Sequence, residues 1–171
     1  STVRVKVPTN IVSPHGMDIG LIENMSAPIA AAGYDFDSLL VPCRCVAADV
    51  VAKEAVVFEE GDLCQALRAS FTYPLYMKPI IVDGKLLFDG GLYNNFPGDV
   101  MLEDFYPDII IGSVVASDLG MPDPDDLMSQ LKALLMSKTD YSAICENGII
   151  IEPDIPDIPV MDFSRIEPLL E

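Results

Sequence analysis

The sequence has little positive charge, a single histidine and no tryptophan. Its 10 lysines and arginines stand against 27 aspartates and glutamates, which gives a net charge of −17. This balance argues against binding to nucleic acid and against electrostatic docking on anionic lipid, because both need clustered basic side chains. With His15 as the only histidine, a zinc site of the HExxH kind is excluded. We expect no metal site and no other cofactor.

Long hydrophobic runs are also missing. No apolar stretch reaches the roughly 18 residues that a membrane-spanning helix needs, and the first residues, STVRVKV, lack the apolar core of a signal peptide. The four cysteines, at positions 43, 45, 64 and 145, are not spaced as a CxxC site, so we expect reduced, structural thiols. Half of the 171 residues are hydrophobic, which is enough for one domain with a real core or for a large part of a bigger one.

Hydrophobic patterning predicts strands that alternate with helices. The expected strands cover residues 3–7, 39–51, 54–60, 79–88 as a hairpin, 108–117 and 148–155, and the expected helices cover 16–33 with a break near Pro28, 61–71, 97–105, 123–138 and the start of one at 162–171. Alternation of this kind favours a layered α/β fold, with a mostly parallel sheet and antiparallel additions. The run at 39–51 is almost continuously apolar, which is typical of a strand covered on both faces.

Two of these elements carry specific local signals. Asp62 precedes the helix at 61–71 as a good N-cap, and Gln65 stands three residues later, where it can complete a capping box. In PIIVDGKLLF, two apolar runs flank Asp83-Gly84, the preferred pair for a two-residue hairpin turn. Both signals fix where an element begins or reverses.

The strand at the end of this hairpin runs into Asp89, Gly90 and Gly91. One interpretation is a second turn, since Asp-Gly is common in turns. The other is a catalytic carboxylate: a loose glycine loop after a strand can present Asp89 in a cleft, where it could take a proton from a serine hydroxyl. On these three residues alone the turn is favoured.

The surrounding motifs favour catalysis. An AAD at 47–49 ends a strand, GDL and ALRAS follow in the helix at 61–70, and DGKLLFDGG at 83–91 leads into NNFP at 94–97. In this order, residues 36–101 strongly resemble the central and C-terminal part of the patatin-like phospholipase family. The tail at 149–171 also looks like the segment that follows the catalytic core in bacterial members.

The resemblance implies a lipid acyl hydrolase that uses a Ser-Asp dyad on a lipid or acyl-ester substrate. By position, Asp89 is the dyad base, and Gly90 and Gly91 shape its loop. Asn94 and Asn95 either support that loop through side-chain hydrogen bonds or are ordinary loop residues. No histidine is required, which fits the position of His15 outside the matching motifs.

The sequence also departs from the family pattern. None of its serines lies in GxSxG, the nearest spacing being GMDIG at 16–20, and no GxGxxG loop is present. Ser70 follows an arginine and an alanine without such an elbow, so we interpret it as a helix C-terminal residue. We expect residues 1–171 to be the C-terminal portion of one patatin-like domain, with the nucleophile elbow and the oxyanion loop outside it, and to be inactive alone.

The resemblance and the expected sheet lead to three more expectations. A non-catalytic, patatin-related α/β module for binding or scaffolding is the alternative to the hydrolase. Some bacterial members belong to outer-membrane proteins, which would place the domain in an exported, membrane-adjacent setting. A sheet that is incomplete on its N-terminal side would leave an unpaired edge and exposed apolar surface, so we expect self-association.

Overall fold

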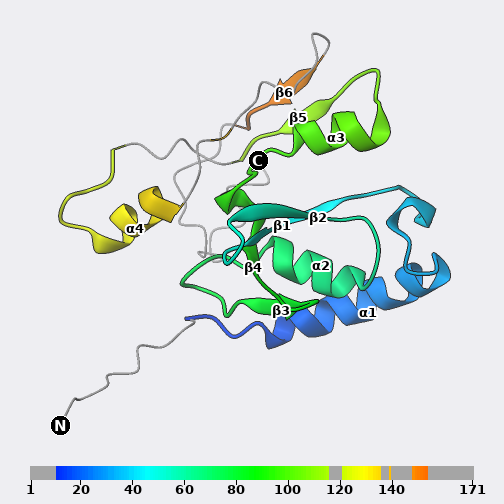
Figure 1. Cartoon of the computed structure of the whole chain (residues 1–171), viewed down its shortest axis with the longest axis horizontal. Helices are drawn as coiled ribbons and strands as arrows, with labels where there is room; N and C mark the ends of the chain where they lie inside the picture. Colours follow the sequence, from blue (N-terminus) through cyan, green and yellow to red (C-terminus); the bar gives the residue numbers. More distant parts are fainter. Residues whose placement is uncertain (1–10, 116–120, 136–138, 140–147, 154–171) are drawn as a thin grey trace.

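The computed structural model describes residues 11–115, 121–135, 139 and 148–153 (Figure 1). Within these ranges helices and strands share the chain, which confirms the mixed α/β class. The helices are α1 (His15–Ala31), α2 (Leu63–Ser70), α3 (Gly98–Phe105) and α4 (Leu127–Leu135), with short 3₁₀ turns η1 (Phe36–Ser38) and η2 (Gly90–Leu92). The strands are β1 (Cys45–Asp49), β2 (Glu54–Phe58), β3 (Ile80–Val82), β4 (Lys85–Asp89), β5 (Ile111–Ser113) and β6 (Ile149–Ile151). The expected strand at 3–7 and helix at 162–171 lie outside the described residues.

The main sheet has the strand order β2-β1-β4-β3, and each of its pairings is antiparallel. The expectation of a mostly parallel sheet is therefore wrong for this sheet, and the parallel pairing in the described residues is that of β5 with β6. Connection length explains the difference. Residues 50–53 join β1 to β2, and two residues join β3 to β4. Links this short can reverse a strand but cannot carry it back for parallel pairing.

The hairpin of β3 and β4 forms where the sequence predicted it. Asp83 and Gly84 both have positive φ, at 50° and 79°, which a type I′ turn requires of its two central residues. The pairing runs from Val82 opposite Lys85 to Ile80 opposite Leu87. Because β4 is longer than β3, Asp89 projects beyond the last pair.

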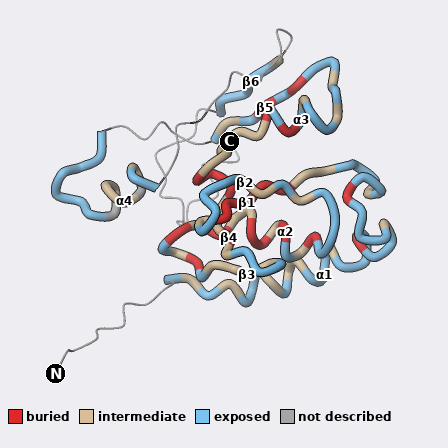
Figure 2. Tube along the Cα trace, in the orientation of Figure 1, coloured by how far each residue is buried: buried red, intermediate tan, exposed pale blue. Residues whose placement is uncertain are grey.

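Strand β1 lies at the centre of the core. All five of its residues are buried, as its apolar sequence predicted (Figure 2). Ala47 packs with Ala69 of α2 and Leu87 of β4, and α2 lies between the sheet and α1 (Figure 1). Asp49 ends β1 as a buried carboxylate that accepts hydrogen bonds from the N–H groups of Val51 and Ala52, so it closes the turn into β2.

Helices α1 and α2 test two of the local sequence predictions, the N-cap of α2 and the break in α1. Asp62 caps α2 by accepting from the N–H groups of Cys64 and Gln65, and the Gln65 side chain returns a bond to its carboxylate. In α1 the expected break near Pro28 does not occur, and the helix continues to Ala31. Pro28 is exposed, so the carbonyl that loses its helical donor can be hydrated.

Candidate active site

Asp89 lies where β4 ends and η2 begins. Its Oδ1 accepts the N–H of Gly91 at 2.9 Å, so the carboxylate caps the 3₁₀ turn. Its own N–H donates to the carbonyl of Thr72 at 2.9 Å, and its Cα is paired with that of Ala47 in β1. The sheet, the segment after α2 and the glycine loop therefore all fix its position.

Gly90 lets this loop lie directly against β1. A Cβ at Gly90 would stand 2.5 Å from the carbonyl oxygen of Val46, so any side chain here would collide with backbone. The Gly90 carbonyl accepts the N–H groups of Tyr93 and Asn94, which closes the loop behind it. Gly90 thus allows the loop to pack closely against β1, and Gly91 supplies the backbone N–H that Asp89 accepts.

A cavity of about 200 Å³ adjoins the carboxylate. Its lining is largely polar and comes from β1, the end of α2, the Asp89 loop and the start of α3. The lining residues are Arg44, Val46, Ser70, Asp89, Gly90, Gly91, Asn94, Asn95 and Pro97.

The sequence missed part of this lining. Ser70 is the last residue of α2, as predicted, yet it also forms part of the cavity that contains Asp89. Arg44 carried no signal in the sequence, because it stands alone within an apolar run. The pairing of β1 with β4 and the packing of α2 against both strands bring these residues together.

The surroundings of Asp89 shift the pKa of its carboxyl group. Burial raises the pKa of this carboxyl above its ordinary value, and the hydrogen bond from Gly91 opposes part of that rise. A carboxyl with a raised pKa is a better proton acceptor in its ionised form than an ordinary aspartate. The pocket therefore holds a carboxylate suited to proton transfer.

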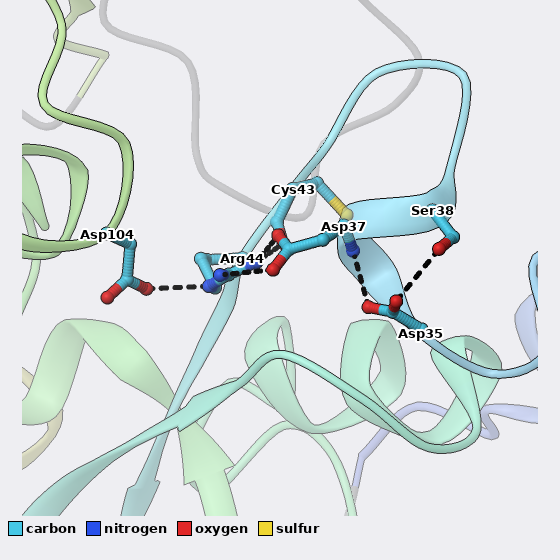
Figure 3. Close-up of polar contacts among 6 residues, drawn as sticks. All are labelled: Asp35, Asp37, Ser38, Cys43, Arg44 and Asp104. Carbon is cyan, nitrogen blue, oxygen red and sulfur yellow. Dashed lines mark hydrogen bonds and ion pairs between the residues drawn. The ribbon is translucent and has the colours of Figure 1, made fainter.

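Arg44 joins three elements beside this cavity (Figure 3). Its guanidinium pairs with Asp37 of η1 at 2.7 Å and with Asp104 of α3 at 2.6 Å, and it lies 4.8 Å from the ring centre of Phe105. The Arg44 side chain is only 7% exposed. Hydrogen bonding to Arg44 lowers the pKa of Asp37 and keeps the guanidinium charged. The cluster holds α3 and η1 against the start of β1.

We expect Arg44→Met to lower the free energy of unfolding by about 2 kcal/mol. Removing one partner of a buried ion pair typically costs more, but both carboxylates here keep some access to water. Because the folded pKa of Asp37 is depressed, its contribution is present above a pH of about 4 and is lost as the pH falls through the folded value. Urea denaturation at pH 7 and pH 3 measures both effects.

Lys85→Met is the matched control, since Lys85 is exposed at the hairpin turn. Its effect should stay within about 0.5 kcal/mol. Equal urea midpoints for the two variants at pH 7 would show that the Arg44 cluster does not stabilise the fold.

Asn94 and Asn95 bond away from the carboxylate. The Asn94 amide donates to both carboxylate oxygens of Asp99 in α3, at 2.9 and 3.2 Å. The Asn95 amide donates to the hydroxyl of Thr139 at 2.9 Å. Asn94 is tied to the loop through its backbone N–H, which bonds Gly90. Their support of the Asp89 loop stays a prediction.

The described ranges also bear on the expectations for metal ligands, membrane helices and cysteines. There, no three histidine, cysteine, aspartate or glutamate side chains gather as metal ligands. No helix in the same ranges has the length and apolar character to cross a bilayer. Cys43, Cys45 and Cys64 are free thiols, and burial raises the pKa of Cys45 to about 12, which keeps it protonated.

Comparisons with known proteins converge on one family. A model of the family described as patatin-like phospholipase matches residues 32–102. An uncharacterized NTE family protein of Mycobacterium tuberculosis is 28% identical over 153 residues, covering 74% of this chain and 26% of that protein. Another from the same species is 36% identical over 76 residues, covering 44% of this chain and 20% of its own length. The mouse patatin-like phospholipase domain-containing protein 6 is 34% identical over 93 residues, covering 53% of this chain and 6% of that protein.

This chain spans about a quarter of the length of the first of these relatives. The family match begins directly after α1 and ends inside α3. It includes β1, the cap of α2 and the Asp89 loop with both of its glycines. Residues 32–102 of this chain, which contain all of these features, match the patatin-like phospholipase family.

Proposed function

We propose that this chain supplies the carboxylate of a Ser-Asp dyad that hydrolyses carboxylic esters of phospholipids or other acyl lipids. The observation that carries the proposal is the half-buried Asp89, whose carboxylate accepts the Gly91 N–H and which lines a small polar cavity. Burial there raises its pKa. The match of residues 32–102 to the patatin-like phospholipase family supports a hydrolase with a lipid substrate.

The two oxygens of Asp89 have different roles in this proposal. Oδ1 accepts the Gly91 N–H, so Oδ2 takes the proton of the serine hydroxyl. The serine oxygen then bonds to the ester carbonyl carbon, and the alcohol leaves with the proton that Asp89 returns. Water next attacks the acyl-enzyme, with Asp89 taking its proton and passing it back to serine. No histidine takes part.

The serine lies outside this sequence in the proposal, because no serine of the 171 residues stands in GxSxG. The part of the domain that we propose to carry it would also supply the oxyanion donors. A membrane-adjacent setting and self-association both stay predictions. Exposed isoleucines on β5 and β6, such as Ile111 and Ile149, provide apolar surface of the kind that self-association would cover.

A fluorophosphonate probe and a short-chain nitrophenyl ester test the proposal together. In the complete protein we expect the probe to modify a GxSxG serine and the ester to be hydrolysed. The 171-residue chain alone should show neither reaction. A complete protein that is folded but neither labelled nor active would favour the non-catalytic binding module.

Activity of the isolated chain would contradict the proposal in a different way. Turnover by this chain that is lost in Asp89→Ala would mean that the nucleophile lies within it. Ser70 would then be the first candidate, because it lines the same cavity as Asp89. The variant Ser70→Ala distinguishes that case.

A further inference from the structure

A second buried arginine, Arg68 of α2, lies behind the site rather than in it. It is 6% exposed, and its Nε donates to Asp18 of α1 at 2.9 Å. One terminal nitrogen donates to the carbonyl of Lys78 at 3.1 Å, and the other donates to the hydroxyl of Thr72. A buried guanidinium is costly unless its donors are used. Here they tie α1, the end of α2 and the approach to β3 together.

Thr72 links Arg68 to Asp89, the proposed dyad base. The residue is fully buried, and its hydroxyl donates to the Arg68 carbonyl at 2.5 Å while accepting from the Arg68 guanidinium. Its side chain is therefore held in one rotamer. Its backbone carbonyl accepts the N–H of Asp89 at 2.9 Å. Thr72 is thus hydrogen-bonded to Arg68 through its side chain and to Asp89 through its backbone carbonyl.

The sheet explains why Asp89 needs this partner. Strand β3 pairs with β4 only as far as Ile80 opposite Leu87, so it ends before Asp89. On its other side, β4 remains paired with β1, where Asp89 stands opposite Ala47. The Thr72 carbonyl takes the place of the missing β3 residue. Ser70, at the end of α2, lies close to Thr72 in the chain and also lines the cavity, so holding Thr72 in place also restrains that part of the cavity lining.

We propose that Arg68 and Thr72 are positioning residues for Asp89, an inference that rests on the proposed role of Asp89 as the dyad base. They touch neither substrate nor nucleophile. They hold the backbone of Asp89 so that its carboxylate meets the serine in the productive geometry. A small misplacement of a reacting group is sufficient to lose much of the rate.

Thr72→Val and Thr72→Ser form the test pair, because serine keeps the hydroxyl and valine keeps the shape. In Thr72→Val, we expect kcat of the complete protein to fall about tenfold or more with KM little changed. Thr72→Ser should restore most of kcat. Amide hydrogen exchange gives a readout that does not depend on activity: exchange at Asp89 should accelerate about tenfold relative to Leu87 of the same strand in Thr72→Val.

Ile29→Val, in a different core cluster, controls for general loosening of the domain. It should leave both kcat and the relative exchange at Asp89 unchanged. If Thr72→Val does not fold, Arg68→Lys replaces it, since a single ammonium cannot reach Asp18, Thr72 and Lys78 together. We expect the same fall in kcat and the same local exchange at Asp89.

The outcomes separate this inference from the proposed function. Asp89→Asn with unchanged kcat would overturn the role of Asp89 and the inference with it. Suppose instead that Asp89→Asn is inactive while Thr72→Val keeps both the kcat and the slow amide exchange at Asp89. That result would overturn the positioning role alone. Loss of kcat in Thr72→Val that serine does not rescue, with no local change in exchange, would also contradict it.

Discussion

Replacing Asp89 with asparagine is expected to lower kcat for ester hydrolysis by about a thousandfold in the complete protein. Asparagine has the same shape and can still accept the Gly91 N–H, so the loop should keep its course. Its amide cannot take the serine proton, and general base catalysis of this kind is typically worth about 10² to 10⁴ in rate. Steady-state kinetics with a nitrophenyl ester and with phospholipid vesicles measures the loss.

The stability of the same variant should move in the opposite direction. Because the folded pKa of Asp89 is raised, its contribution to stability is present below a pH of about 4 and is lost as the pH rises through the folded value. Asparagine never ionises, so the variant should gain stability relative to the wild type over that interval. Urea midpoints between pH 3 and pH 7 follow this difference. A variant that is less stable at pH 7 would show that the charged form is favoured by the fold.

Asp83→Asn is the matched control for activity. Asp83 is exposed at the opposite end of β4, and its positive φ of 50° is one that asparagine tolerates well. The change removes the same charge from the same hairpin, so kcat should remain within about twofold of the wild type. An equal loss of activity in both variants would point to a general effect of charge rather than to Asp89.

The parts of the fold that the sequence predicted depend on neighbours in the chain. The turn at Asp83-Gly84 needs two adjacent residues with positive φ, and the cap of α2 needs Asp62 next to the N–H groups that it accepts. The burial of β1 follows from its own apolar run. Each of these is decided within a few residues, where local propensity and tertiary structure agree.

The parts that the sequence could not predict depend on contacts across the chain. Arg44 pairs with Asp104, which lies 60 positions later. Ser70 and Asp89 share a cavity only because α2 packs beneath β1 and β4. The predicted strand direction was also wrong, since alternation of strands and helices does not reveal how short the links between paired strands are. The family motif identified the candidate carboxylate, and only the structure revealed its cavity.

Gly90→Ala is expected to be the most disruptive single change near the site. The new Cβ would stand 2.5 Å from the Val46 carbonyl oxygen and 2.9 Å from the carbonyl carbon. These are backbone atoms of the central strand, so they cannot move aside as a flexible side chain would. Overpacking of this kind costs about 3 kcal/mol, which corresponds to a fall in Tm of about 6–12 °C for a domain of this size.

The displaced loop should also remove activity, because Gly90 is adjacent to Asp89. Gly20→Ala is the control: Gly20 lies within α1, and a Cβ added there would meet nothing within 4 Å. Alanine at this position should stabilise the helix by about 0.5–1 kcal/mol. Thermal unfolding of the two variants should therefore shift in opposite directions. A Gly90→Ala protein with wild-type Tm and kcat would mean that the loop does not lie against β1, and the geometry assigned to Asp89 would fall with it.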